Sequence, residues 1–153
     1  MIVPVAGDFR LNTEADTARL GAALAEALRK GEAVCLSGPL GAGKSVLARG
    51  LVRALSPGER DVPSPTFTLV QFYQGRRFPI AHFDLYRLAN PTEALEIGLD
   101  EALHDGAVVI EWAERLGHHL PANRLDVELT PDGDTRRARL TPHGAWEDRA
   151  IDV

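Results

Sequence analysis

The sequence contains little cysteine, little lysine and no long hydrophobic run. Its single cysteine, Cys35, cannot form an internal disulfide, and with no CxxC pair there is no zinc site built on paired thiolates. No stretch approaches the 18 apolar residues that a transmembrane helix needs, and Met1–Phe9 has neither the basic cluster nor the apolar run of a secretory signal. We therefore expect a cytoplasmic protein without a membrane contact.

The length and composition are those of a globular domain. The chain has 153 residues, of which 44% are hydrophobic and 25% are charged, so disorder and fibrous repeats are excluded. A chain of this size buries about two thirds of its unfolded surface, which is enough to fold without disulfides. We expect residues 1–153 to form a single domain.

The charges indicate what kind of partner the chain binds. The net charge of −5 lacks the basicity of a protein that binds nucleic acid on its own. Of the 17 basic residues only Lys30 and Lys44 are lysines. Arginine replaces lysine easily at exposed sites, so a lysine in this chain stands where its compact charge matters.

Strand and helix patterns alternate along the chain. A capping box at Thr13–Asp16 predicts the start of a helix that continues to Leu28. Polar turns at 74–77 and 131–134 predict hairpins, and 113–116 predicts a turn. Further helices are expected at 44–55 and at 91–97, stopped by Gly98, and strands at 9–12, 33–37, 67–73, 78–84, 108–112, 124–130 and 136–141. The pattern predicts an α/β fold with a mixed sheet, flanking helices and antiparallel hairpins.

A phosphate-binding motif lies between the expected strand 33–37 and the helix 44–55. Residues 38–45, GPLGAGKS, match GxxxxGK[ST], so the fold class becomes a P-loop NTPase-like domain. The glycines let backbone N–H groups turn toward a phosphate, which the N-terminus of the helix also attracts. Lys44, expected on the solvent side and outside the core, can reach the β- and γ-phosphates, and Ser45 offers a hydroxyl to Mg²⁺.

A P-loop also needs a carboxylate at the end of a neighbouring strand. Asp84 ends the expected strand 78–84, and Glu111 follows three apolar residues in VVIE. Either acid can hold the metal or polarise water, and Glu111 is the better candidate because its strand is more uniformly apolar. A solvated acid at a strand end remains the alternative for each.

Two further segments carry distinctive side chains. Residues 62–67, VPSPTF, pair two prolines with two hydroxyls, and this loop is either a switch with Thr66 facing the γ-phosphate or a plain proline turn. The segment HFDLYR follows at 82–87. The five histidines have no metal-ligand spacing, so we expect them on the surface or in packing roles.

These motifs together resemble the TsaE family, the bacterial P-loop ATPases needed to make threonylcarbamoyladenosine in tRNA. The resemblance covers residues 8 to 130, through GPLGAGKS (38–45), PSPTFTLV (63–70), HFDLYRL (82–88) and VVIEWAERL (108–116). Two positions depart from the family pattern: Pro39 stands where an acidic residue is common, and Ser45 where threonine is common. The last two dozen residues resemble nothing specific.

The resemblance implies an activity, cofactors and partners. The protein is expected to bind ATP or ADP with Mg²⁺ and to hydrolyse ATP while docked on the TsaB–TsaD pair, which itself handles the tRNA. Hydrolysis is expected to involve Lys44, Glu111, Asp84 and Thr66, with Mg²⁺ held by Ser45, Glu111 and Asp84. The nucleotide-binding residues implied are Thr13, Glu14, Gly38, Gly41, Ala42, Gly43, Lys44, Ser45, Val46 and Trp112.

Two other functions compete with this one. A small-molecule P-loop kinase usually carries a lid with several arginines, and Arg76-Arg77 is the local pair that resembles one, in a hairpin too short for a lid. The second rival is a nucleotide-dependent binding module without catalysis. Phosphorylation of a small substrate favours the kinase, and nucleotide binding without phosphate release favours the module.

Overall fold

The computed structural model describes residues 1–59 and 61–153. Its helices are α1 (Glu14–Ala27), α2 (Lys44–Leu55), α3 (Thr92–Glu96), α4 (Leu99–Asp105) and the 3₁₀ helices η1 (Ala113–His119) and η2 (Gly144–Trp146). Its strands are β1 (Ile2–Pro4), β2 (Gly7–Leu11), β3 (Ala33–Ser37), β4 (Val70–Gln74), β5 (Pro79–Asp84), β6 (Ala107–Glu111), β7 (Arg124–Asp132), β8 (Thr135–His143) and β9 (Ala150–Asp152). The expected α/β class is confirmed.

The main sheet is mixed, as the sequence predicts. Within the described residues it has seven strands in the order β2-β8-β7-β3-β6-β5-β4. The central strands β7, β3, β6 and β5 run parallel, while β2, β8 and β4 pair antiparallel with their neighbours. Because the carboxyl ends of β3, β5 and β6 meet at one edge, the residues that follow them lie together there.

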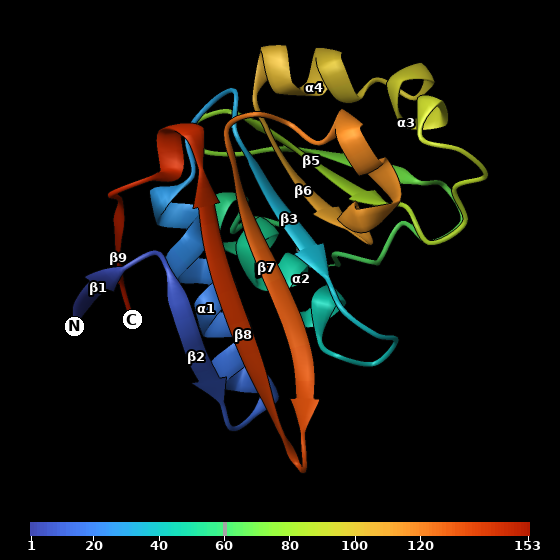
Figure 1. Cartoon of the computed structure of the whole chain (residues 1–153). Helices are drawn as coiled ribbons and strands as arrows, with labels where there is room; N and C mark the ends of the chain where they lie inside the picture. The colour runs from blue at the N-terminus through green and yellow to red at the C-terminus, as the bar shows by residue number, and fades with distance from the viewer. Residues whose placement is uncertain (60) are drawn as a thin grey trace.

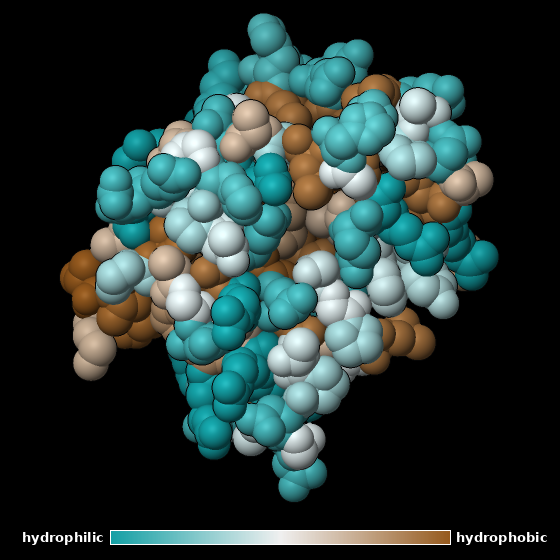
Figure 2. Space-filling view, viewed as in Figure 1, coloured by the Kyte–Doolittle hydropathy of each residue, from teal (hydrophilic) through white to brown (hydrophobic). Residues whose placement is uncertain are grey.

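Helices cover both faces of the central strands (Figure 1). Strand alternation divides the apolar side chains: Val34 and Val109 face the core formed with α1 and α2, while Cys35 and Ile110 face a second core that includes residues of α3, α4 and η1. On β7 and β8 the face turned away from α1 and α2 is polar, and Figure 2 shows it as a hydrophilic band. None of the helices in the described part of the chain has the length and apolar character that crossing a bilayer requires.

Helices α1 and α2 pack against each other at unusually short range. A Cβ added to Gly21 would lie 2.2 Å from the Leu47 carbonyl oxygen, and one added to Gly50 would lie 2.4 Å from that of Ala18. These two glycines therefore let the helix backbones touch. The contact fixes α2, whose N-terminus carries the P-loop, against α1, whose N-terminus begins at the predicted capping box of Thr13.

The terminal segments pair with each other and pack on the same core. Strands β1 and β9 form a small antiparallel sheet, and the two chain ends lie side by side in Figure 1. Trp146 is fully buried in the core formed with α1 and α2. The Arg149 guanidinium binds the Glu32 carboxylate at 2.6 and 2.9 Å, and both side chains are buried. The C-terminal residues, which match no motif, are thus an integral part of the fold.

Some predicted boundaries are wrong for local physical reasons. The strand expected at 67–73 begins at Val70, because Leu69 adopts φ +69° and its N–H bonds the Pro65 carbonyl to close a turn. Gly98, at φ +99°, ends α3 but also precedes the unpredicted α4. The turn expected at 113–116 is the 3₁₀ helix η1.

Candidate nucleotide-binding site

A cleft of about 470 Å³ opens at the carboxyl edge of β5 and β6. The P-loop, the loop at 63–67, the start of α1 and the start of β8 surround it. Its lining includes the predicted residues Thr13, Glu14, Gly41, Gly43, Lys44, Ser45, Val46, Thr66, Asp84, Glu111 and Trp112. Two predicted residues do not line it: Ala42 is buried in the core, and Gly38 packs against Leu129 of β7.

The start of α2 provides the anion-binding end of the cleft. Gly43 precedes the helix at φ +105°, a conformation that favours glycine, and no side chain caps the helix there. The first backbone N–H groups of α2 are therefore free to bind an anion, and the helix dipole adds a partial positive charge. Strand β3 ends at Ser37 and α2 begins at Lys44, so the loop 38–43 connects the strand to the helix, as the motif predicts.

We expected Lys44 on the solvent side, but in the structure it is almost fully covered, with 5% of its surface exposed. Its ammonium donates hydrogen bonds to the carbonyls of Gly38 and Pro39, at 2.6 and 2.8 Å, and lies 4.0 Å from the Trp112 ring centre. Burial lowers the pKa of Lys44, while the nearby carboxylates of Glu114, Glu111 and Asp84 oppose that shift. The expectation failed because the side chain folds back along its own loop.

Glu111 is buried at the end of β6, with 2% of its surface exposed. Its Oε1 accepts a hydrogen bond of 2.6 Å from the Ser45 hydroxyl, and its Oε2 lies 2.6 Å from His82 Nε2. Burial raises the pKa of Glu111, but hydrogen bonds and charge from His82 and hydrogen bonds from Ser45 and Ser64 outweigh it, so the net pKa lies below the ordinary value of 4.5. The carboxylate is therefore ionised, and it is not the solvated strand-end acid of the alternative interpretation.

Asp84 is also buried, directly across from Glu111 on the adjacent parallel strand. Its Oδ2 accepts hydrogen bonds from Ser64 at 3.0 Å and from Thr66 at 3.1 Å, and its Oδ1 accepts one from the Tyr86 N–H. Ser64 Oγ also lies 3.4 Å from Glu111 Oε2. The loop at 62–67 is thus tied to both carboxylates, a contact that a plain proline turn does not require.

Trp112 follows Glu111 with a left-handed backbone, at φ 58°. A tryptophan rarely adopts this conformation, and such strain clusters at functional sites. Here it turns the indole into the cleft beside Lys44, and the Tyr86 ring lies 4.9 Å away between ring centres. Tyr86 lies in the HFDLYR segment, but sequence reasoning gave it no role.

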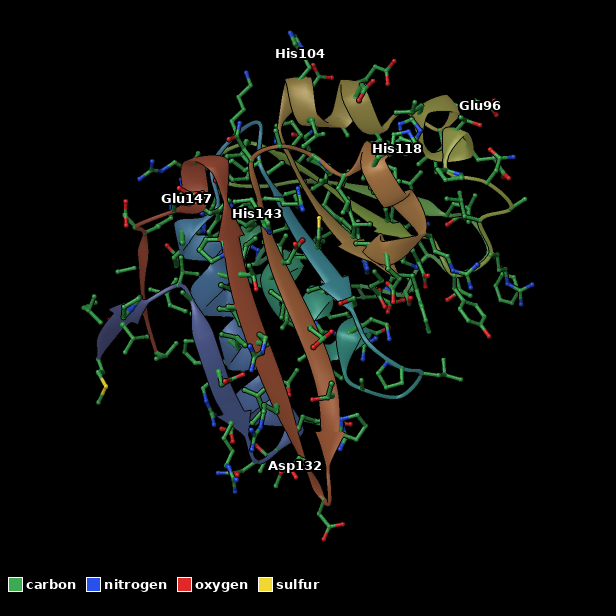
Figure 3. All side chains as sticks on the ribbon, in the orientation of Figure 1. Glu96, His104, His118, Asp132, His143 and Glu147 are labelled. Atoms are coloured by element: carbon green, nitrogen blue, oxygen red, sulfur yellow. The ribbon has the colours of Figure 1, made fainter. Side chains whose placement is uncertain are left out.

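The start of β8 contributes a further basic group that sequence reasoning missed. Arg136 lines the cleft and donates a hydrogen bond of 3.3 Å to the Gly41 carbonyl of the P-loop. Nothing local in the sequence marks it, because the contact depends on how far the β7–β8 hairpin extends toward the loop. Asp132, labelled in Figure 3, lies beside the turn of that hairpin, at the same end as Arg136.

The histidines divide into one buried group and several peripheral ones. His82 has no exposed surface and contacts Glu111, so the expectation of a plain packing residue is incomplete. His104, His118 and His143 lie apart on α4, η1 and β8 (Figure 3). The spacing HxD on one strand was a usable signal, because residues i and i+2 share a face.

A magnesium ion fits the oxygen groups at the carboxyl edge. Among the described residues no group of three or more His, Cys, Asp or Glu side chains could hold a metal ion. Mg²⁺, however, is usually bound by one or two carboxylates together with hydroxyl, phosphate and water oxygens. The Ser45 hydroxyl 2.6 Å from the Glu111 carboxylate, with Asp84 on the next strand, is a donor set of that kind.

The fold and the cleft define a P-loop NTPase-like protein. The solved structure of YdiB from Bacillus subtilis has a similar architecture, with a TM-score of 0.73 and 27% sequence identity. The match covers 94% of this chain and 87% of that chain.

Sequence comparisons identify the family. The model of threonylcarbamoyl adenosine biosynthesis protein TsaE matches residues 11–139. Proteins named tRNA threonylcarbamoyladenosine biosynthesis protein TsaE are 38% identical over 127 residues in Rickettsia conorii (83% of this chain, 73% of that protein) and 42% identical over 132 residues in Nostoc sp. (82% and 80%). A third, in Mycobacterium tuberculosis, is 42% identical over 134 residues (80% and 79%). The chain belongs to the TsaE family, and the resemblance inferred from its motifs is confirmed.

Proposed function

We propose that this protein is a Mg²⁺-dependent ATPase that acts in tRNA threonylcarbamoyladenosine biosynthesis, in the cytoplasm, while docked on TsaB and TsaD. Family membership supports the pathway. The observation that carries the ATPase activity is the position of Ser45, at the phosphate-binding end of α2, within 2.6 Å of the Glu111 carboxylate. Residues 1–153 act as one domain, since both terminal segments pack with the central elements.

The P-loop residues bind the phosphates in this proposal. Backbone N–H groups of residues 41–46 surround the β-phosphate, and Lys44 leaves the Gly38 and Pro39 carbonyls to contact the β- and γ-phosphates. Thr13, Glu14 and Arg136 line the cleft beyond the loop, where the nucleoside part fits. Ser45 and Glu111 hold Mg²⁺, which supplies charge neutralisation to the phosphates when it is bound.

Asp84 and Thr66 position the attacking water. The water oxygen bonds to the γ-phosphorus as the bond from that phosphorus to the bridging oxygen of ADP breaks. Asp84 accepts the water proton, which leaves with the phosphate, so ATP and water yield ADP and phosphate. Thr66 and Ser64 already donate to Asp84, so a change at the γ-phosphate reaches the loop at 62–67 directly.

Partner docking is supported by the charges and the surface around the cleft. Of the arginines in the described residues, Arg136 lines the cleft, and its hydrogen bond goes to the P-loop backbone. A second cation for the transition state is therefore best supplied by a partner, an arrangement that can increase the rate by 10³ or more. The large apolar side chains of Leu40 and Phe67 are exposed at 77% and 82%, next to the cleft, where a partner can cover them.

Steady-state phosphate release, with and without the TsaB–TsaD pair, tests the proposal. We expect slow hydrolysis by the protein alone and at least a tenfold acceleration by the pair. Fast hydrolysis that the pair leaves unchanged contradicts docking, and ATP binding without hydrolysis in either condition indicates the binding module. The kinase has no support from Arg76 and Arg77, which bind backbone carbonyls at the ends of α2 and α1, at the opposite end of β5 from Asp84.

A further inference from the structure

A buried histidine in β5 has no role in the function proposed above. His82 lies two residues before Asp84 on the same strand, and its register partner on β6 is Val109, two residues before Glu111. Alternate residues of a strand share a face, so His82, Asp84 and Glu111 all point to the α2 side of the sheet. His82 is 0% exposed, which separates it from any solvent-exposed role.

The contact between His82 and Glu111 has a definite direction. The 2.6 Å distance joins His82 Nε2 to Glu111 Oε2, and an ionised carboxylate only accepts hydrogen bonds. The proton of the bond therefore belongs to Nε2. The other ring nitrogen, Nδ1, is buried without a hydrogen-bond partner among the described residues. If the ring carries a single proton, that proton belongs on Nε2, because a buried N–H left unpaired is more costly than a bare ring nitrogen.

The two oxygens of Glu111 are thus held by different partners. His82 binds Oε2 from the neighbouring strand β5, and Ser45 binds Oε1 from the start of α2. Two bonds on opposite oxygens fix both the position and the plane of the carboxylate. A Glu side chain has three rotatable bonds, and without such partners it can swing away from the P-loop.

We infer that His82 is a positioning residue, which holds Glu111 in the orientation that allows its carboxylate and the Ser45 hydroxyl to bind one magnesium ion together. This inference rests on the proposed function, because it concerns the metal site of the same cleft. His82 is not among the residues that line the cleft, so its effect on the metal passes through Glu111. Partners of this kind typically change metal affinity by about 10- to 100-fold.

Three substitutions of His82 distinguish the positioning of Glu111 by a hydrogen bond from the mere filling of space by the ring. His82→Gln places an amide N–H near the position of Nε2 and keeps a donor for Glu111. His82→Asn is polar but too short to reach Oε2, and His82→Leu fills the space without a donor. The measured quantity is the ratio of the ADP dissociation constants in EDTA and in saturating Mg²⁺, obtained by calorimetry on the full chain.

We expect the Asn and Leu variants to lose about 10- to 100-fold in this ratio, while the Gln variant stays within about threefold of the original protein. The affinity for ADP in EDTA should be unchanged in all three. A Leu variant that keeps the original ratio overturns the inference. So does an equal loss of ADP affinity with and without Mg²⁺, because it indicates a structural role.

A second measurement needs no nucleotide. In long-range ¹H–¹⁵N spectra of the labelled, nucleotide-free protein, His82 should show a proton on Nε2. That proton signal should vanish in His82→Gln and shift in Glu111→Gln. A ring with no proton on Nε2 overturns the inference. If the original protein binds no ADP in either condition, the proposed function fails, while the spectra still show whether His82 holds Glu111.

Discussion

Glu111→Gln should strongly reduce metal-dependent hydrolysis while leaving the fold nearly unchanged. The amide has the shape of the carboxylate, and each of its partners can adapt. Its oxygen can accept from His82, and its N–H can donate to the Ser45 hydroxyl, which accepts as readily as it donates. What the substitution removes is the negative charge that attracts the metal.

The expected effect of Glu111→Gln on stability is much smaller than its expected effect on the rate of hydrolysis. Exchanging charge-assisted hydrogen bonds for neutral ones costs about 1 kcal/mol net, since the buried charge and its desolvation disappear together. In a chain of 153 residues this corresponds to a decrease of about 2–4 °C in Tm. Loss of the metal-binding charge should lower kcat by about 10²–10³-fold, or about 2.7–4 kcal/mol in the activation free energy.

The assay is phosphate release as a function of Mg²⁺ concentration, with TsaB and TsaD present, together with thermal unfolding. Glu96→Gln is the matched control, because Glu96 is an exposed acid of α3 that does not line the cleft. It should hydrolyse ATP at the original rate. If Glu111→Gln keeps its Mg²⁺-dependent hydrolysis within about threefold, the metal role belongs to Asp84, and Asp84→Asn should then show the larger loss.

Three other predictions concern Lys44, the buried acid and the C-terminal segment. Lys44→Met keeps the buried stem and removes the ammonium, so ATP affinity measured by calorimetry should fall about 100-fold or more while Tm stays within a few degrees; unchanged affinity contradicts the P-loop assignment. The pKa of Glu111 lies below 4.5, so its ionised form stabilises the fold above about pH 4.5 and loses that effect as the pH falls; the stability difference from Glu111→Gln should shrink in acid, and a constant difference contradicts the shift. Arg149→Met leaves Glu32 buried without its cation, which should lower the free energy of unfolding by about 3–5 kcal/mol. Arg139 forms an exposed ion pair with Asp8, so Arg139→Met should lower it only slightly.

The elements that the sequence predicted well are those with strong local signals. The bounds of β3 and α2 agree with the expectation, because an apolar run, a glycine loop and a helix start follow one another without a gap. The capping box at Thr13 was likewise visible, since Thr13 and Asp16 bond each other's backbone N–H. Asp84 and Glu111 were each expected at the end of a strand, and in the structure they end the adjacent parallel strands β5 and β6.

The features that could not be predicted depend on contacts between distant segments. The His82–Glu111 bond requires the register of β5 on β6, and Arg136 reaches Gly41 across 95 positions of sequence. The buried Arg149–Glu32 pair spans 117 positions. No periodicity or motif in the sequence predicts strand register or how far a hairpin extends. From the sequence alone, these residues are therefore interpreted as ordinary surface charges or packing residues.

The charged side chains of the cleft form hydrogen bonds with other groups of the same chain, and these bonds affect nucleotide binding. Lys44 donates to two loop carbonyls, Ser45 donates to Glu111, and Ser64 donates to Asp84. These bonds offset the desolvation of buried charges and keep the P-loop in shape. In the proposed function, a nucleotide with its metal replaces the bonds of Lys44 and Ser45, so the gain in binding is the difference between two sets of bonds. Ser64 also connects Asp84 to the loop at 62–67, which carries the exposed Phe67 at its end. In the proposed docking, a partner that covers Phe67 contacts the loop whose hydroxyls bond to Asp84, and this contact is the route by which docking would alter the rate of hydrolysis.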